Sequence, residues 1–258
     1  MFIHNIDPVL FQLGNFEIRY YGIIYALGFI ISYYLIYYLA KERKINLTKD
    51  DVSDYIFYSI ISVILGARSA HVIANYEFYL NNPLNIFAIW NGGLAFHGGL
   101  IGLLIMSYIF SKKKRIHFYD LADIVVIPAV LALALGRMGN FLNGELYGKI
   151  TNVPWAVKFQ NAEGFRHPSQ IYESLKNFFI FFTLWIIKNK NLPKGFLFWS
   201  FVTLYGILRF TIEYFFREPI SPLGFLILNL TVTNISNIIM FIVGLIMLYK
   251  LRKYDSKT

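Results

Sequence analysis

The sequence predicts an all-α polytopic membrane protein with seven transmembrane helices, an external N-terminus and a cytoplasmic C-terminus. Of its 258 residues, 57% are hydrophobic and 15% are charged, whereas soluble domains are about 45–50% apolar and about 25% charged. A helix needs about 20 mostly apolar residues to cross a bilayer, and several stretches approach or exceed that length. Few residues remain for a soluble part, so we expect a single integral membrane domain over residues 1–258.

Seven apolar stretches are candidate spans, and the third and fifth of them are short. They lie at roughly 20–40, 52–74, 93–110, 118–137, 170–187, 195–215 and 229–250. Outer loops are expected at about 75–92, 138–169 and 217–228. No short hydrophobic segment with a small-residue cleavage site is apparent, so no removable signal peptide is expected. The chain has no cysteine, which excludes disulfides, thiolate metal sites and a cysteine nucleophile.

Lysine and arginine residues alternate between successive connections. Fifteen of the 24 fall after spans one, three, five and seven, and only five lie on the opposite side. Cytoplasmic loops of membrane proteins carry an excess of these residues, which places the N-terminus outside and the C-terminus in the cytoplasm. The net charge of +9 is therefore interpreted as topology charge and not as a nucleic-acid patch. The expected surroundings are a lipid bilayer, with no nucleic-acid partner.

Polar residues gather at the outer end of the fourth span. The stretch GRMGNFLNGELYG (136–148) places Arg137, Asn140, Asn143 and Glu145 among four glycines. We expect Arg137 to end the span and the other three residues to follow in a turn. An arginine fork beside amide donors suits a phosphate group, and Glu145 would orient the arginine or hold a polar headgroup. An ordinary helix-terminating loop is the alternative.

Two further arginines lie within spans or at their edges. A charge at the bilayer centre costs about 2.5–3.5 kcal/mol and usually faces a protein interior or a wet cavity, so Arg68 and Arg209 are candidate site residues. In YGILRFTIEYFFRE (205–218), Tyr205, Arg209 and Glu213 recur every four residues and share one stripe of a helix. That stripe is either part of a site or an internal Arg209–Glu213 ion pair that makes the charges tolerable.

His97 lies between two Gly-Gly pairs in NGGLAFHGGLIG (91–102). Glycine permits tight turns and close backbone approach, and a histidine has an unperturbed pKa near 6.5 that suits a general base. The alternative is an ordinary hydrogen-bonded histidine, with Gly98 and Gly102 forming a small-residue contact between helices.

Together, the outer-side residues predict a pocket for an anionic lipid headgroup with a base nearby. No metalloprotease, hydrolase or phosphate-loop pattern occurs, and we expect neither a metal nor a cofactor. A membrane transporter or channel for an anionic substrate is the alternative, although the internal repeats common in transporters are not apparent. A non-catalytic membrane scaffold would give no reason for an outer-side set of arginine, histidine and glutamate.

Several stretches resemble the bacterial prolipoprotein diacylglyceryl transferases, in order along nearly the whole chain. The 136–148 stretch is similar to the family signature GRxGNFxNxE followed by an aromatic residue and glycine, and it matches every fixed position. Also similar are RYYGIIYALGF near the start, GARSAHV, FHGGLIG, RHPSQIYES and YGILRFTIEYFFRE. One departure is TVTNISNII at the start of the last span, where the family usually has a Gly-Gln pair before the serine. The preceding LGFLILNL (223–230) is more apolar than expected.

The resemblance implies a transferase, with residues 1–258 forming one catalytic domain. It would move the diacylglyceryl group of phosphatidylglycerol to the lipobox cysteine thiol in the signal peptide of a preprolipoprotein, releasing glycerol phosphate without a metal. This would be the first step of lipoprotein maturation, in the bacterial cytoplasmic (inner) membrane with the active site towards the outer face.

The resemblance also implies residue roles by matched position. Arg137 and Arg209 would handle the phosphate, and His97 would assist thiol deprotonation. If His97 instead positions the headgroup, we expect Tyr205 or the field of Arg209 to activate the thiol. The other expected site residues are Tyr21, Asn140, Asn143, Glu145, Glu213 and Asp123, with Arg68 as a further substrate-binding residue.

Overall fold

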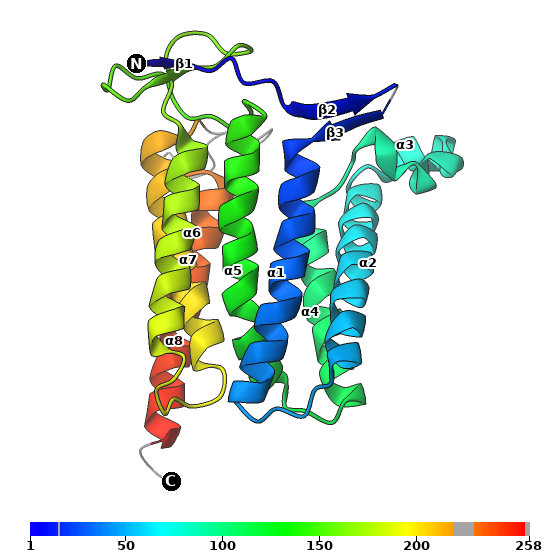
Figure 1. Ribbon diagram of the computed structural model, residues 1–258, viewed down its shortest axis with the longest axis vertical. Helices are drawn as coiled ribbons and strands as arrows, with labels where there is room; N and C mark the ends of the chain where they lie inside the picture. The colour runs from blue at the N-terminus through cyan, green and yellow to red at the C-terminus, as the bar shows by residue number, and fades with distance from the viewer. Residues whose placement is uncertain (15, 219–229, 256–258) are drawn as a thin grey trace. The chain divides into compact units, whose positions relative to one another are not determined.

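The computed structural model describes residues 1–14, 16–218 and 230–255, and within them the chain forms eight α-helices and four short strands (Figure 1). The helices are α1 (Tyr20–Glu42), α2 (Lys49–Ala74), α3 (Tyr76–Asn81), α4 (Phe96–Lys113), α5 (Phe118–Leu142), α6 (Ser169–Ile187), α7 (Phe196–Phe216) and α8 (Val232–Asp255). Two 3₁₀ turns, Pro83–Phe87 and Ile89–Asn91, lie between α3 and α4.

The long helices coincide with the seven predicted spans. Among the described residues, five helices are long and apolar enough to cross a membrane, namely α1, α2, α5, α7 and α8. Helices α4 and α6 occupy the positions of the third and fifth predicted spans, which the sequence already marked as short. The fold is therefore that of a polytopic helical membrane protein.

Two small sheets add to the predicted helices. Strand β1 (Phe2–Ile3) pairs in parallel with β4 (Val157–Lys158), and β2 (Val9–Leu13) pairs antiparallel with β3 (Phe16–Arg19). The expectation of an all-α chain omitted them because the strands are short and mostly exposed. Strands β1 and β2 lack the alternation of apolar and polar residues that identifies a half-buried strand, and β3 and β4 show it over only four and two residues.

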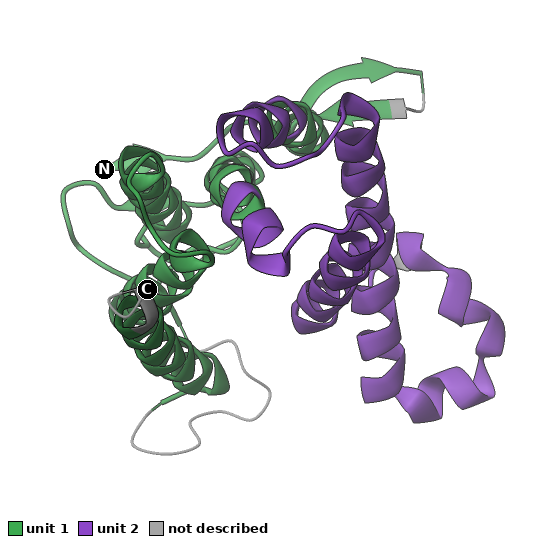
Figure 2. Cartoon of the chain, turned by 90° about the horizontal axis from the view of Figure 1, so that it is seen from below, with its two compact units in different colours: residues 1–32, 125–258 green, residues 33–124 purple. Residues whose placement is uncertain are grey.

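Contacts divide the chain into two compact units, which are coloured separately in Figure 2. The first unit comprises residues 1–32 and 125–258, and within it α7 packs against α6 and against α8. Ser174 of α6 donates a hydrogen bond to the Ala134 carbonyl of α5 (2.9 Å). This contact places one face of α6 beside the last turns of α5.

The second unit comprises residues 33–124 and is built on the packing of α2 against α4. Gly66 of α2 faces Gly98 and Gly102 of α4 so closely that a Cβ at Gly66 or Gly98 would overlap the carbonyl oxygen of the other. Small residues allow membrane helices to approach in this way. The alternative interpretation of Gly98 and Gly102 as a helix-packing contact is therefore confirmed.

Candidate active site

The signature stretch closes α5 and enters the loop before α6. Helix α5 continues to Leu142, so the expectation that the helix ends at Arg137 is wrong, and Asn140 is helical as well. The glycines suggested a helix end, but Gly139 is needed for packing inside the helix. A Cβ there would lie 2.9 Å from Cδ2 of Tyr21. Since residues three apart share a helix face, Arg137 and Asn140 point to the same side.

Amide groups surround Glu145 in the turn that follows α5. Glu145 Oε1 accepts hydrogen bonds from Asn140 Nδ2 (2.8 Å) and Asn143 Nδ2 (3.2 Å). The backbone carbonyl of Glu145 accepts a third from Gln170 Nε2 of α6 (2.6 Å). Tyr21 is within hydrogen-bond reach of Asn140. Four residues that the sequence predicted for the site therefore lie together, and Gln170 joins them.

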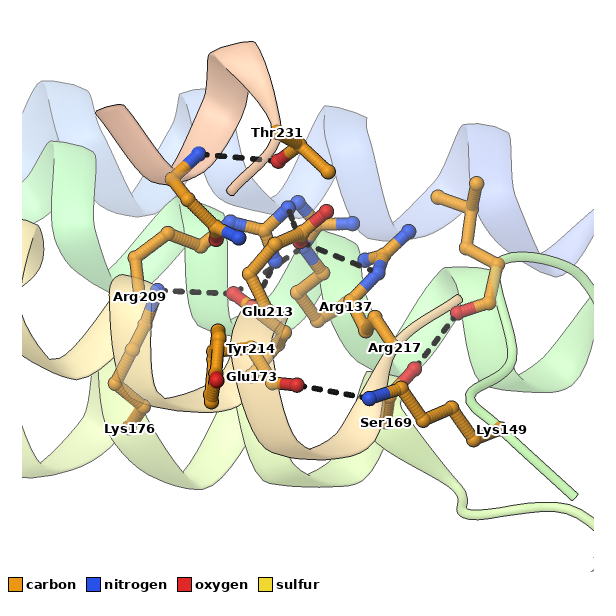
Figure 3. Close-up of polar contacts among 12 residues, drawn as sticks. Arg137, Lys149, Ser169, Glu173, Lys176, Arg209, Glu213, Tyr214, Arg217 and Thr231 are labelled. Carbon is orange, nitrogen blue, oxygen red and sulfur yellow. Dashed lines mark hydrogen bonds and ion pairs between the residues drawn. The ribbon is translucent and has the colours of Figure 1, made fainter. Parts of the chain in front are cut away.

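A second group of charged side chains lies between α5, α6 and α7 (Figure 3). We call it the arginine cluster, and its members are Arg137, Glu173, Lys176, Arg209, Glu213 and Arg217. Glu173 is at its centre, with a side chain that is 0% exposed. Its Oε1 contacts Arg209 Nη1, and its Oε2 accepts a hydrogen bond from Lys176 Nζ at 2.9 Å.

The remaining pairs extend the cluster along α7. Arg209 Nη2 lies 2.7 Å from Glu213 Oε2, and Arg217 Nε lies 3.5 Å from the same oxygen. These are ion contacts and not aligned hydrogen bonds, since neither Glu213 Oε2 nor Arg217 Nε has a hydrogen-bond partner among the described residues. Tyr205, one turn before Arg209, is within hydrogen-bond reach of Arg137.

The cluster carries an excess of positive charge. Four cations surround two carboxylates, which leaves about two positive charges in a poorly solvated place. Buried charges are costly unless they are paired, so this arrangement favours an anion as an additional partner. Arg137 is the most accessible of the four cations, at 22% side-chain exposure, and its nearest carboxylate oxygen, Glu173 Oε2, is 4.0 Å away.

Sequence reasoning missed Glu173 and Lys176 as site residues, although a signal was present. Both are charged residues within the predicted fifth span, at 170–187, where a charge has the same cost as at Arg137. Arg217 was also missed. It follows Glu213 by four residues, the spacing that brings two side chains together on a helix.

Arg68 is fully engaged by backbone carbonyls in the second unit. Its five N–H donors point to five carbonyl oxygens, those of Asn85, Ile86, Ala88, Gly92 and Gly93. Its guanidinium also lies 5.3 Å from the centre of the Tyr79 ring. Only glycine fits at position 93, because its φ is +75° and a Cβ would lie 2.7 Å from Arg68 Nη1. The geometry favours Arg68 as the organiser of the segment before α4 over a direct contact with phosphate.

Asp123 and His97 both belong to the second unit. Asp123 is fourteen residues before Arg137 on α5, a rise of about 21 Å along the axis, and it pairs with Arg43 Nη1 at 3.3 Å. It is therefore not grouped with Arg137, because its helix carries it towards the opposite end. His97 is exposed in the first turn of α4, and the two glycines that follow it are helical.

The loop before α6 is fastened to the end of α7. Gly148 N–H donates to the His167 carbonyl (2.9 Å), and Lys149 N–H donates to the Phe216 carbonyl (2.9 Å). A Cβ at Gly148 would overlap the Phe216 carbonyl oxygen. Burial lowers the pKa of the His167 imidazole, and the positive charge of Lys149 lowers it further. This loop therefore connects the residues around Glu145 to the helix that carries Arg209.

Two expectations fall largely on residues that the structure does not describe. Most of the predicted outer loop at 217–228 lies in the range 219–229, and so does most of the apolar stretch 223–230. Among the described residues, no group of three or more histidine, aspartate or glutamate side chains could hold a metal ion.

Comparison with known proteins agrees with the resemblance of the motifs. The sequence model of the family described as prolipoprotein diacylglyceryl transferase matches residues 8–250. A phosphatidylglycerol–prolipoprotein diacylglyceryl transferase of Geobacter sulfurreducens is 44% identical over 246 residues, 94% of each chain. Proteins of the same name from Coxiella burnetii (41% over 229 residues, 87% of each chain) and Aeromonas hydrophila (40% over 248 residues, 95% of this chain and 90% of the relative) are also similar. The chain belongs to the prolipoprotein diacylglyceryl transferase family.

Proposed function

We propose that this protein transfers the diacylglyceryl group of phosphatidylglycerol to the lipobox cysteine of a preprolipoprotein signal peptide. The family membership and the relatives' names support the reaction and both substrates. The arginine cluster supports the assignment of specific residues, because it is a buried group on membrane helices with an excess of positive charge. An anionic phospholipid headgroup has the complementary charge.

In the proposed reaction the cysteine thiol loses its proton, and the thiolate sulfur attacks the glycerol carbon of the diacylglyceryl group that is bonded to phosphate. The C–O bond to phosphate breaks, a thioether forms, and glycerol phosphate leaves with the electron pair. The phosphodiester carries one negative charge, whereas the departing monoester approaches two at neutral pH, since its second pKa is about 6. A site with excess positive charge therefore binds the leaving state more strongly than the starting lipid, which is how a catalyst accelerates a reaction.

We assign Arg137 to the lipid phosphate and Arg209 to the charge that develops on it. Arg137 is the more exposed of the two and the more loosely held by carboxylates. Arg209 is fixed by Glu173 and Glu213, so its charge is preorganised. Tyr205 is retained as a candidate catalytic residue beside them.

The residues around Glu145 are proposed to bind the polar headgroup. Glu145, Asn140 and Asn143 already share hydrogen bonds, and carboxylate and amide groups are suitable partners for the hydroxyl groups of a glycerol. Tyr21 belongs to the same group through Asn140. For His97, the proposal is assistance in removing the thiol proton. A free thiol has a pKa near 8.5 and needs a base or a positive field to form the thiolate.

We further propose seven spans, with the N-terminus outside, the C-terminus in the cytoplasm and the site towards the outer face of the bacterial inner membrane. The alternation of basic connections supports this orientation. A reporter fused after Lys114 should then read cytoplasmic, and one fused near Asn161 should read external. The reverse result at either fusion would refute the seven-span arrangement.

The central experiment is a transfer assay with the purified protein in detergent, phosphatidylglycerol and a lipobox peptide. The expected product is the peptide with a diacylglyceryl group on its cysteine, found by mass spectrometry, together with one glycerol phosphate for each peptide modified. A peptide with serine in place of the cysteine should give no product. Absence of product with the cysteine peptide would contradict the proposed function.

A further inference from the structure

Lys176 lies inside the arginine cluster but has no part in the reaction as proposed. Its ammonium donates a hydrogen bond to Glu173 Oε2 at 2.9 Å, and the nearest nitrogen of Arg137 lies 4.0 Å from that same oxygen. Arg209 occupies the other oxygen, Oε1. Lys176 therefore holds the carboxylate oxygen that Arg137 faces.

Lys176 is fixed in this position by its surroundings. Its side chain is 3% exposed, and its ammonium lies 3.8 Å from the centre of the Tyr205 ring on α7. It follows Glu173 by three residues on α6, so both side chains emerge on one helix face. A buried lysine in a membrane helix is costly, and here the carboxylate and the aromatic face offset that cost.

We propose that Lys176 is a positioning residue that occupies Glu173 and so leaves Arg137 available to bind the lipid phosphate. This inference rests on the proposed function. Without the ammonium, Oε2 of Glu173 would lose its hydrogen-bonded cation and would attract Arg137, which faces the same oxygen, more strongly. Closing about 1.2 Å would give a charge-assisted hydrogen bond of ordinary length, about 2.7–2.9 Å. Arg137 would then be shared between Glu173 and the phosphate.

The principal variant is Lys176→Met, which keeps an unbranched side chain of similar length and removes the charge. In the transfer assay we expect the KM for phosphatidylglycerol to rise about tenfold, the size expected for one weakened charge-assisted contact. We expect kcat to change less than about threefold. Lys188→Met is the matched control, because Lys188 lies twelve residues later, at the end of α6, and its KM should equal that of the wild type.

A second pair of variants separates positioning from a direct or structural role. In Glu173→Gln the neutral amide no longer draws Arg137 strongly, so Lys176 should have little left to do. The double variant Glu173→Gln/Lys176→Met is therefore expected to have nearly the same KM as Glu173→Gln. Each variant is compared at equal amounts of monodisperse protein, so that a loss of folded material does not alter the measured KM.

Three results would overturn the inference. The first is an unchanged KM in Lys176→Met. The second is an equal rise in KM when Lys176→Met is added to Glu173→Gln, which would mean that Lys176 acts without Glu173. The third result concerns the case in which Lys176→Met does not fold. The inference is then overturned if the KM of the double variant is clearly above the KM of Glu173→Gln. Wild-type turnover tests the proposed function separately, and direct binding of phosphatidylglycerol to the same variants tests this inference even without turnover.

Discussion

Arg209 Nη2 lies 2.7 Å from Glu213 Oε2, one turn further along α7, and the same guanidinium also contacts Glu173 of α6. The double variant Arg209→Gln/Glu213→Leu should fold, because removing both partners of a buried ion pair is often tolerated. It should not transfer the diacylglyceryl group, since the leaving phosphate would lose its preorganised charge. Size-exclusion chromatography and the transfer assay measure the two effects. Near-normal activity would show that Arg209 and Glu213 only neutralise each other, which is the alternative interpretation of their spacing.

Arg137 should depend on the shape of its guanidinium as well as on its charge. Arg137→Ala is expected to abolish transfer, and Arg137→Lys should reduce kcat/KM about 10–100-fold, because lysine keeps the charge but loses the two-pronged geometry. Arg19→Lys is the control, since Arg19 is exposed and pairs with Glu17 in β3. A nearly active Arg137→Ala variant would show that this arginine serves packing or topology.

Arg68 should stabilise the segment before α4. Lysine has three donors and cannot satisfy five carbonyls, and each buried polar group left unpaired costs about 1–3 kcal/mol. Arg68→Lys should therefore lower the melting temperature and speed hydrogen exchange across residues 82–95. Arg115→Lys, at an exposed position, should change neither. If hydrogen exchange were unchanged but phosphatidylglycerol binding were lost, Arg68 would instead be assigned to direct contact with the phosphate.

His167 should make the loop before α6 sensitive to acid. Burial lowers its pKa below the ordinary 6.5, and Lys149 lowers it further, so the folded loop holds it neutral while the unfolded loop takes up a proton as pH falls through about 6.5. Stability is therefore complete above about pH 6.5 and declines below it. Hydrogen exchange over residues 148–168, corrected for intrinsic rates, should rise between about pH 7 and about pH 5. His167→Gln should remove that rise, whereas His117→Gln should not.

His97 should reveal its role through pH. His97→Gln keeps hydrogen bonding but removes the base, and loss of a general base typically costs about 10²–10⁴-fold. Solution supplies more thiolate as pH approaches the thiol pKa near 8.5, so the variant should be slow near neutrality and partly rescued towards about pH 9. An equal deficit at every pH would assign His97 to headgroup positioning and make Tyr205 the better candidate for activating the thiol.

The helices were predictable from the sequence because hydrophobic length and basic connections are local properties that the membrane imposes. The same applies to the Arg209–Glu213 pair, which follows from a spacing of four on one helix. The end of α5 was not predictable from its glycines, since Gly139 is determined by the Tyr21 ring, which comes from α1.

Contacts between distant segments explain the other differences. The central place of Glu173 depends on cations from three helices, and the sequence shows only that a charge lies in a span. Arg68 donates to backbone carbonyl oxygens about 17–25 residues away. The direction in which a backbone carbonyl points cannot be read from the residue type. Side-chain type therefore indicated which residues were unusual, but it did not indicate whether they face a ligand or the backbone.

The close packing of α2 and α4 has a mechanical consequence for lipid traffic. At Gly66, Gly98 and Gly102 the backbones are in contact, so no side chain lies between the helices at these positions, and Tyr55 and Ser107 join the same two helices by a 2.8 Å hydrogen bond. We therefore expect the two helices to tilt or shift together. A diacylated lipid cannot pass between α2 and α4 where their backbones are in contact, so sideways entry from the bilayer would require another boundary of the protein.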